Sequence, residues 1–338
     1  MATSDMYRIV VTDTDMPSFE IEEAVLRPLG AEVHLAPSSD EATLAKEAAS
    51  ADAIMVGYAP VTARVIAAAA EAGCRAIVRY GIGFDNVDIA AAERHGIPVA
   101  NVPDYCQDEV ADHAILLLLA YARKLIPASQ SVRDGGWEIP KGQVPRLARQ
   151  HLGLVGFGRI GRRVAVRALT LGLVVEAYDP VAPIDLPGVT TAGSLTDLLA
   201  SADYVSLHLP LTAATRHIID RNALKAALRK PVLINTARGG LVDLDAVIEA
   251  LDAGTLSGIA LDVFENEPLA ANHPLRRHPA ALITPHMSYY SNESEPDLIR
   301  RVAEEIARGL RGEPLLNPLT KVRVAVSRAG QTGSSARL

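Results

Sequence analysis

The sequence predicts an α/β protein with two Rossmann-like, doubly wound parallel-sheet domains. Three observations support this fold class. The length of 338 residues exceeds the usual size of a single hydrophobic core. Short β-branched runs alternate with alanine-rich helical runs along the chain. A glycine-rich turn, Gly156-Phe157-Gly158-Arg159-Ile160-Gly161, joins a predicted strand to a predicted helix near the middle.

The first third of the chain alternates strands with helices, which predicts one parallel sheet. The expected strands are residues 9–12, 32–35, 53–56, 76–80 and 99–101. The expected helices are residues 20–29, 39–49, 63–72 and 89–95. Ligand-binding loops lie at the carboxyl ends of parallel strands, so the loop at residues 80–86 is a candidate substrate site.

Residues 109–133 predict one long helix, which Gly135 and Gly136 end. Residues 137–150, with two prolines and several basic residues, are expected to form a connecting loop. The apolar stretch at residues 114–122 is far shorter than the roughly 20 residues that cross a bilayer. We therefore expect a buried helix and no membrane association.

The glycine-rich turn predicts a dinucleotide site. Gly156 permits a tight turn, Gly158 lets the backbone approach a pyrophosphate, and Gly161 lets the helix pack close to the strand. The positive end of that helix favours the phosphate charge. Asp179 ends the next predicted strand, where a carboxylate accepts hydrogen bonds from the ribose hydroxyls and repels a 2′-phosphate. The cofactor is therefore expected to be NAD rather than NADP.

The second sheet is expected to continue to residue 284. Its remaining elements are helices at 195–199, 221–228 and 243–253 and strands at 204–209, 232–235, 258–263 and 282–284. The helix at 293–310 follows the closed second domain, so it is expected to return to the first sheet. The predicted domains are residues 1–102 with 287–320 (substrate-binding, flavodoxin-like) and residues 103–286 (NAD-binding). Residues 321–338 have little apolar surface and are expected to be a flexible tail.

Three polar residues follow predicted strands of the second half: Arg238, Glu267 and His286. A guanidinium at Arg238 can bind a carboxylate or carbonyl through paired donors, although a surface ion pair is the alternative. A carboxylate near His286 stabilises the charged imidazole, so His286 and Glu267 form a candidate acid/base pair. A hydrogen-bonded structural histidine is the alternative for His286. His208 is expected to be either cofactor-adjacent or structural.

Composition excludes several other classes of protein. The net charge of −7 and the absence of a Lys/Arg-rich run predict no direct nucleic-acid partner. No histidine or cysteine spacing suits a metal, so none is expected. Cys74 and Cys106 are too few for a disulfide framework, and they are expected to be buried residues of a cytoplasmic protein. The polar N-terminus lacks a secretory pattern.

Over residues 9–317 the chain resembles the D-isomer-specific 2-hydroxyacid dehydrogenases. Five motifs that carry this resemblance occur in family order: RYGIGFDN at 79–86, GFGRIG at 156–161, NTARGGLVD at 235–243, LDVFENEP at 261–268 and TPH at 284–286. Within the family, residues 84–86 and 286–291 look most like the C-terminal binding protein branch, whose eukaryotic members are NAD(H)-dependent transcriptional corepressors. Tyr289 replaces a tryptophan of that branch and Ile82 a serine, so its substrate preference is not transferred.

The resemblance implies an active site in the cleft between the two domains, whose closure excludes water. Arg238 would hold a small 2-oxo acid, NADH would give hydride to C2, and His286 would protonate the oxygen while Glu267 orients the imidazole. Asp262 would lie near the nicotinamide carboxamide, and residues 210–215 would form a wall along the cofactor. Expected substrate contacts are Arg79, Tyr80, Gly81, Ile82, Gly83 and Tyr289. Expected NAD contacts are Val110, Gly156, Phe157, Gly158, Arg159, Ile160, Gly161, Asp179, His208, Leu209, Pro210, Thr215, Thr236, Ala237, Arg238, Asp262, His286 and Ser288.

The resemblance also implies a homodimer built around the NAD-binding domains. Two other functions stay open. The first is a corepressor-type binding protein that senses NAD(H) and turns over little substrate. The second is a phosphoglycerate or phosphite dehydrogenase on the same scaffold. The size of the substrate pocket would depend on Tyr80, Tyr289 and Tyr290.

Overall fold

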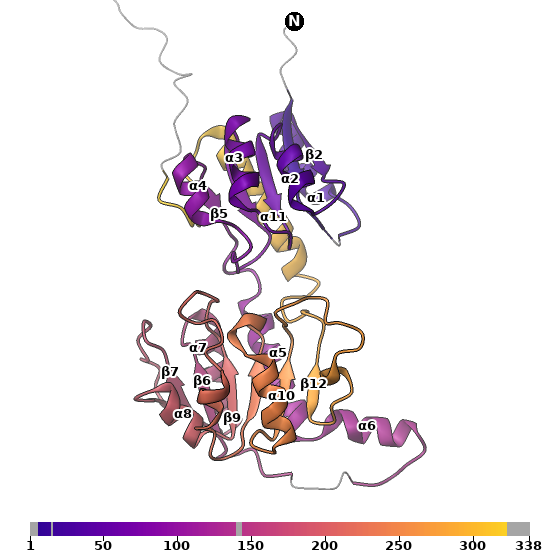
Figure 1. The fold of residues 1–338 in the computed structure, drawn as a ribbon, viewed down its shortest axis with the longest axis vertical. Coiled ribbons are helices and arrows are strands. Elements are labelled where there is room, and N and C mark those ends of the chain that lie inside the picture. The colour runs from indigo at the N-terminus through magenta and orange to yellow at the C-terminus, as the bar shows by residue number, and fades with distance from the viewer. Residues whose placement is uncertain (1–5, 15, 140–143, 323–338) are drawn as a thin grey trace, which may run out of the picture. The chain divides into compact units, whose positions relative to one another are not determined.

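A computed structural model describes residues 6–14, 16–139 and 144–322. The chain forms two compact units (Figure 1). It passes from the first unit to the second between Tyr105 and Cys106, and returns between Ser291 and Asn292. The predicted boundaries, after residues 102 and 286, fall a few residues before these crossings. All but two residues of the predicted tail at 321–338 lie outside the described residues.

The first unit contains a parallel five-stranded sheet with helices on both faces. Its strand order is β2-β1-β3-β4-β5, from Ala31–Leu35, Tyr7–Val11, Ala53–Val56, Ala76–Arg79 and Val99–Ala100. Its helices are α1 (Glu20–Leu26), α2 (Glu41–Ala48), α3 (Ala63–Glu71), α4 (Ile89–His95) and α11 (Ser294–Arg311). Apolar residues of α2, α3 and α4 form one buried cluster, and those of α1 and α11 form another. Figure 1 shows α11 among the first elements of the chain, as the sequence predicts.

The second unit contains a parallel seven-stranded sheet. Its order is β12-β11-β10-β9-β6-β7-β8, from Ala281–Ile283, Gly258–Leu261, Val232–Asn235, Tyr204–Leu207, His151–Val155, Val174–Tyr178 and Val189–Thr191. Its helices are α5 (Gln107–Ala122), α6 (Leu125–Arg133), α7 (Arg159–Thr170), α8 (Leu195–Ser201), α9 (Arg221–Leu224) and α10 (Leu244–Asp252). Helices α5 and α7 pack in one buried cluster, and α8, α9 and α10 in the other. The predicted fold class is therefore confirmed for both units.

The second sheet reverses its strand order between β6 and β9, which are neighbours. In open parallel sheets, ligands bind outside the carboxyl ends of strands at such a reversal. The glycine-rich turn follows β6 directly, and His208 follows β9. The topology therefore brings the predicted dinucleotide turn to the position where this fold binds nucleotides.

The predicted helix at 109–133 is wrong as a single element, because the structure divides it into α5 and α6. Lys124 adopts a left-handed backbone conformation (φ 50°) between the two helices. Pro127 gives a physical reason: it lacks an N–H, and inside a continuous helix its ring would clash with the carbonyl of Arg123. In α6 it occupies the first turn, where proline is tolerated.

Smaller differences concern the ends of elements and one short strand. The strands predicted at 204–209 and 258–263 end at Leu207 and Leu261, and the helix predicted at 221–228 ends at Leu224. The edge strand β8 was not predicted, because three residues are too few to show an alternating pattern. Among the described residues, no helix is both long enough and apolar enough to cross a bilayer, and no cluster of metal-ligating side chains occurs.

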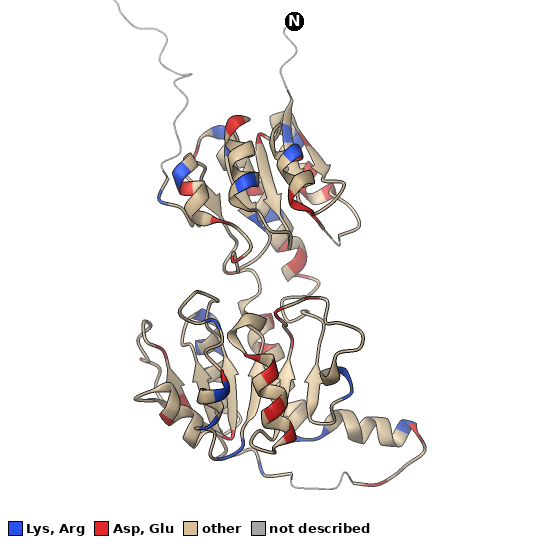
Figure 2. Ribbon diagram, in the orientation of Figure 1, with Lys and Arg blue, Asp and Glu red and all other residues tan. Residues whose placement is uncertain are grey.

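Figure 2 shows acidic and basic residues on elements of both units. Helix α10, for example, exposes Asp245, Glu249 and Asp252.

Both cysteines are buried, and burial raises the pKa of the Cys74 thiol to about 12, which keeps that group protonated at neutral pH.

Candidate active site

The predicted catalytic residues lie on the segments that follow three neighbouring strands of the second sheet. In β10, β11 and β12 the final residues are aligned in register, with Asn235 opposite Leu261 and Leu261 opposite Ile283. Because the strands are parallel, the segments that carry Arg238, Glu267 and His286 all begin at the same edge of the sheet.

The structure brings His286 and Glu267 into direct contact. His286 Nδ1 lies 2.6 Å from Glu267 Oε2, although the residues are 19 positions apart. The two side chains are only 25% and 29% exposed. Glu267 is itself held by its loop, since the Phe264 amide donates to Oε1 at 2.7 Å. An ionised carboxylate accepts only, so Nδ1 carries the hydrogen of this pair.

His286 has an unusual backbone conformation that Asp262 holds in place. Its φ of +51° lies in the left-handed region, which a non-glycine residue adopts at a cost of about 1 kcal/mol or more. The amides of His286, Met287 and Ser288 donate to the Asp262 carbonyl, Oδ1 and Oδ2 at 2.8, 3.0 and 2.9 Å. The Asp262 side chain is 0% exposed. One buried residue therefore determines the turn that presents the imidazole.

Helix α5 supports the same segment with two residues that the sequence reasoning missed. His113 Nε2 lies 3.2 Å from Thr284 Oγ1, and the Thr284 hydroxyl donates to Asp262 Oδ1 at 2.5 Å. At the other end of the segment, Ser291 Oγ donates to Glu109 Oε1 at 3.0 Å. Glu109 and His113 are four residues apart on one face of α5. The only signal in the sequence was their spacing, because the first half of α5 carries other polar residues as well.

Arg238 lies on a turn that packs against the Glu267 loop. Asn235 holds this turn, because its side-chain amide donates to the Arg238 carbonyl at 2.8 Å and its Oδ1 accepts from Ala237 at 3.0 Å. A Cβ added to Gly239 would lie 1.9 Å from the carbonyl carbon of Phe264. Only glycine permits this close approach between the Arg238 turn and the loop that carries Glu267.

Of the three glycines of the glycine-rich turn, only Gly158 has open space beside it. A Cβ on Gly156, whose φ is +99°, would meet the His208 carbonyl at 2.6 Å, and one on Gly161 would lie 2.3 Å from the Gly156 oxygen. A Cβ on Gly158 would meet nothing within 4 Å. Gly158 caps α7, so this open space lies where the helix exposes its first amides. The turn therefore fits a bound pyrophosphate.

Asp179 lies beside this turn and holds three amides. Phe157 donates to Oδ2 at 2.7 Å, and Val181 and Ala182 both donate to Oδ1 at 2.8 Å. Burial alone would raise the pKa of Asp179, but these backbone hydrogen bonds outweigh it and lower the pKa below its ordinary value. The Asp179 carboxylate is therefore ionised at neutral pH.

The other predicted cofactor residues differ in how much of them a ligand could reach. Thr236 Oγ1 is buried and has no hydrogen-bond partner among the described residues, as expected for a group that a ligand satisfies. Thr215 Oγ1 donates to the Pro210 carbonyl at 2.7 Å and closes the loop at 210–215. Val110, Leu209 and Ser288 are buried and offer little surface to a ligand.

His208 lies against the glycine-rich turn. Its Nε2 lies 2.9 Å from Ser206 Oγ, and its backbone packs on Gly156. Desolvation lowers the pKa of His208 to about 4, so the ring is neutral at pH 7. This arrangement favours the structural alternative for His208.

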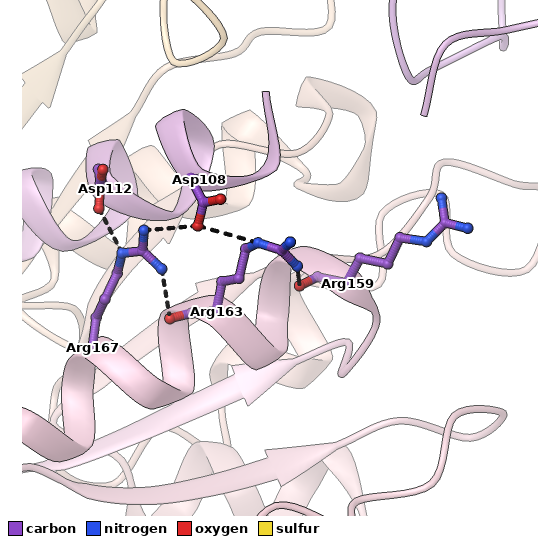
Figure 3. A network of polar contacts seen from close by, with 5 residues as sticks. All are labelled: Asp108, Asp112, Arg159, Arg163 and Arg167. Carbon is purple, nitrogen blue, oxygen red and sulfur yellow. Dashed lines mark hydrogen bonds and ion pairs between the residues drawn. The ribbon is translucent and has the colours of Figure 1, made fainter. Parts of the chain in front are cut away.

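Helix α7 carries four arginines, and Figure 3 shows three of them with their partners. Arg163 and Arg167 contact Asp108 of α5 at 3.2 and 3.0 Å, and Arg167 also contacts Asp112 at 2.5 Å. The Arg159 side chain extends away from this network (Figure 3). Arg159 is the first residue of α7, directly after Gly158.

The predicted substrate loop lies in the first unit. Gly81 has a φ of +125°, and its carbonyl accepts from the Val102 amide at 3.2 Å, while Asn101 donates to the Ile82 carbonyl at 2.5 Å. The Tyr80 hydroxyl donates to Glu22 Oε1 at 2.8 Å inside the core. The Tyr80 side chain therefore packs in the core, whereas Phe84 and Asp85 of the same loop are exposed.

The two other tyrosines follow His286 in the second unit. The Tyr289 ring lies edge-on to the His286 ring, with centroids 6.5 Å apart, and Tyr290 lies edge-on to Tyr289 at the same distance. Tyr290 is exposed. An aromatic side chain thus lies beside the imidazole, as a group that shapes a substrate pocket would.

Comparisons with known proteins agree with these features. Residues 115–288 match the family model of the D-isomer specific 2-hydroxyacid dehydrogenase, NAD binding domain. The chain is 35% identical over 329 residues to D-3-phosphoglycerate dehydrogenase from Methanocaldococcus jannaschii, which covers 96% of this chain and 62% of that protein. It is 37% identical over 261 residues to glyoxylate reductase from Korarchaeum cryptofilum, covering 75% and 78% respectively.

A solved structure supports the same relationship. An NADPH-dependent glyoxylate/hydroxypyruvate reductase from Sinorhizobium meliloti, in complex with NADP and malonate, is 29% identical, with a TM-score of 0.83 over 94% of this chain and 98% of that one. The chain spans only 44% to 62% of several phosphoglycerate dehydrogenases that it matches. The family prediction is confirmed, and NAD is the cofactor of the matched domain. This chain belongs to the D-isomer-specific 2-hydroxyacid dehydrogenase family.

Proposed function

We propose that the protein interconverts a small 2-oxo acid and the corresponding D-2-hydroxy acid, with NAD(H) as the hydride carrier. The contact between His286 Nδ1 and Glu267 carries this proposal. It places a proton donor of fixed orientation in the same unit as a turn that fits a dinucleotide. The strained backbone conformation of His286, which three amide hydrogen bonds to Asp262 hold in place, supports the proposal.

The side chains supply binding and proton transfer. When bound, NADH supplies the hydride that reaches C2 of the 2-oxo acid. Arg238 binds the substrate through its paired N–H donors. His286 Nε2 gives its proton to the developing alkoxide at the C2 oxygen, and Glu267 stabilises the imidazolium before transfer. In the oxidative direction, Nε2 takes the proton back from the hydroxyl.

Other residues position the substrate and cofactor. We propose that amides of Gly81, Ile82 and Gly83 bind the substrate carboxylate, and that Arg79 and Tyr289 contact the substrate. Gly158 and Arg159 would hold the pyrophosphate, and Asp179 the adenosine ribose. Asp262 would act through the turn of His286, since both of its carboxylate oxygens accept hydrogen bonds within the protein.

The substrate class is tested by loss of NADH absorbance with a panel of 2-oxo acids. The panel contains glyoxylate, hydroxypyruvate, pyruvate, 3-phosphohydroxypyruvate and bulkier 2-oxo acids. We expect turnover with at least one, and D-specific oxidation of its product. Selective use of the phosphorylated acid would favour the phosphoglycerate alternative, which matches the names of several relatives. NADH binding with no turnover across the panel would favour the corepressor-type alternative and contradict the proposed activity.

We also propose a homodimer formed by the second unit. Helix α6 exposes Leu125, Ile126 and Val132, and α5 exposes Leu116, so this unit carries more exposed apolar surface than a monomer needs. Sedimentation at low micromolar concentration should give twice the mass of the chain. Replacing Leu125 and Ile126 with serine should shift the protein to a monomer, and a monomeric wild-type protein would contradict the proposal. The cytoplasmic location and the resemblance to the C-terminal binding protein branch stay predictions.

A further inference from the structure

An arginine of the dinucleotide unit lies beside Asp179 and is held by a second carboxylate. Arg162, on the second turn of α7, pairs with Asp185 Oδ1 and also donates to the Pro183 carbonyl. Its guanidinium carbon lies 4.8 Å from the centroid of the Phe157 ring. The Phe157 amide is the group that donates to Asp179 Oδ2 at 2.7 Å. Arg162 therefore borders the residue that is expected to bind the adenosine ribose.

We propose that the Arg162–Asp185 pair is a specificity determinant that disfavours NADP. This inference rests on the proposed dinucleotide site. A guanidinium near the ribose is the usual protein ligand for a 2′-phosphate, because its paired donors match the phosphate oxygens. Here Asp185 and the Pro183 carbonyl already occupy that guanidinium, and its face covers Phe157. A 2′-phosphate would have to displace Asp185 to reach it.

The charge around Asp179 also disfavours the 2′-phosphate of NADP. Asp179 and Asp185 contribute two carboxylates next to one guanidinium, so the ribose region has a net negative charge. The neighbouring arginines on α7 do not offset it, because Arg163 and Arg167 are paired with Asp108 and Asp112 (Figure 3). Arg159 precedes them at the start of the helix, where it would serve the pyrophosphate that NAD and NADP share.

The size of the effect follows from exposure. The side chains of Arg162 and Asp185 are 32% and 64% exposed, and ion pairs at such positions are weak and screened by salt. Removal of Asp185 should therefore change NADP(H) affinity by about fivefold. Asp179 would account for the rest of the discrimination.

The test measures cofactor binding rather than turnover. NADH and NADPH are titrated by nicotinamide fluorescence into the full-length wild-type protein and Asp185→Asn. We expect the Kd for NADPH to fall by about fivefold in the variant at low salt, while the Kd for NADH changes less than about twofold. The gain should shrink at high salt, because freed Arg162 binds the phosphate by charge.

Two further variants make the outcome specific. Glu249→Gln removes a similar exposed carboxylate from its pair with Arg221, and should leave the ratio of the two Kd values unchanged. In the double variant Arg162→Ala/Asp185→Asn the gain in NADPH binding should disappear. If NADH binds but NADPH affinity is unchanged in Asp185→Asn, or the gain persists without Arg162, the inference is overturned while the proposed function stands. If the wild-type protein binds neither cofactor, the proposed function fails as well.

Discussion

Replacing His286 with alanine is expected to lower kcat for reduction of a 2-oxo acid by about 10² or more, with little change in the Kd for NADH. The variant loses the imidazole that protonates the C2 oxygen, and water replaces it poorly as an acid at neutral pH. The turn itself should persist, because the bonds from its amides to Asp262 involve the backbone. Steady-state kinetics and a fluorescence titration of NADH measure the two quantities.

A matched control is His34→Ala in the first unit. His34 Nε2 lies 3.5 Å from a Glu32 carboxylate oxygen, so this histidine also pairs with a carboxylate. It is far from His286 along the chain. This variant should keep the wild-type kcat. Full activity of His286→Ala, or an equal loss of activity in both variants, would contradict the assigned proton transfer.

The second large effect is expected for Asp262→Ala. This change removes the carboxylate acceptor for the amides of Met287 and Ser288 and for the Thr284 hydroxyl, in a position with no access to water. A buried donor left without an acceptor costs about 1–3 kcal/mol, which applies in full to the buried Ser288 amide, so we expect at least about 1 kcal/mol less stability in urea unfolding. The left-handed conformation of His286 should relax, and kcat should fall even where the variant remains folded.

Asp252→Ala is the control for the loss of a carboxylate, because that side chain is 70% exposed and near the end of α10. It should change the stability by less than about 0.5 kcal/mol. Asp262→Asn should lie between wild type and Asp262→Ala, since the amide retains one oxygen acceptor. Wild-type stability and kcat in Asp262→Ala would show that the turn does not depend on this residue.

Local sequence patterns were sufficient to predict most of the fold. The alternation of strands and helices and the glycine-rich turn are each visible within a few tens of residues, and the return of the last helix follows from the order of the elements along the chain. The break at Lys124 has a local signal as well, because Pro127 disfavours a continuous helix there. The edge strand β8 had no pattern long enough to detect.

The long-range hydrogen bonds that hold the His286 segment in place could not be predicted from local patterns. His113 contacts Thr284 over 171 positions, and Ser291 contacts Glu109 over 182. Such contacts depend on the packing of α5 against the sheet, which periodicity does not specify. Asp262 illustrates the limit: its motif indicates the site, but only coordinates reveal that its oxygens hold a turn. The Arg162–Asp185 pair likewise needs the path of the loop after β7.

The return of α11 to the first sheet also affects how the protein is made. On the ribosome, the sheet of the first unit emerges early, yet Leu298, Val302 and Ile306, which cover one of its faces, are synthesised almost two hundred residues after β5. Until α11 has been synthesised, part of that apolar face is not yet covered. The second unit, Cys106–Ser291, is contiguous in the chain and can fold as soon as it has emerged. The first unit is thus completed only after the second unit has been synthesised.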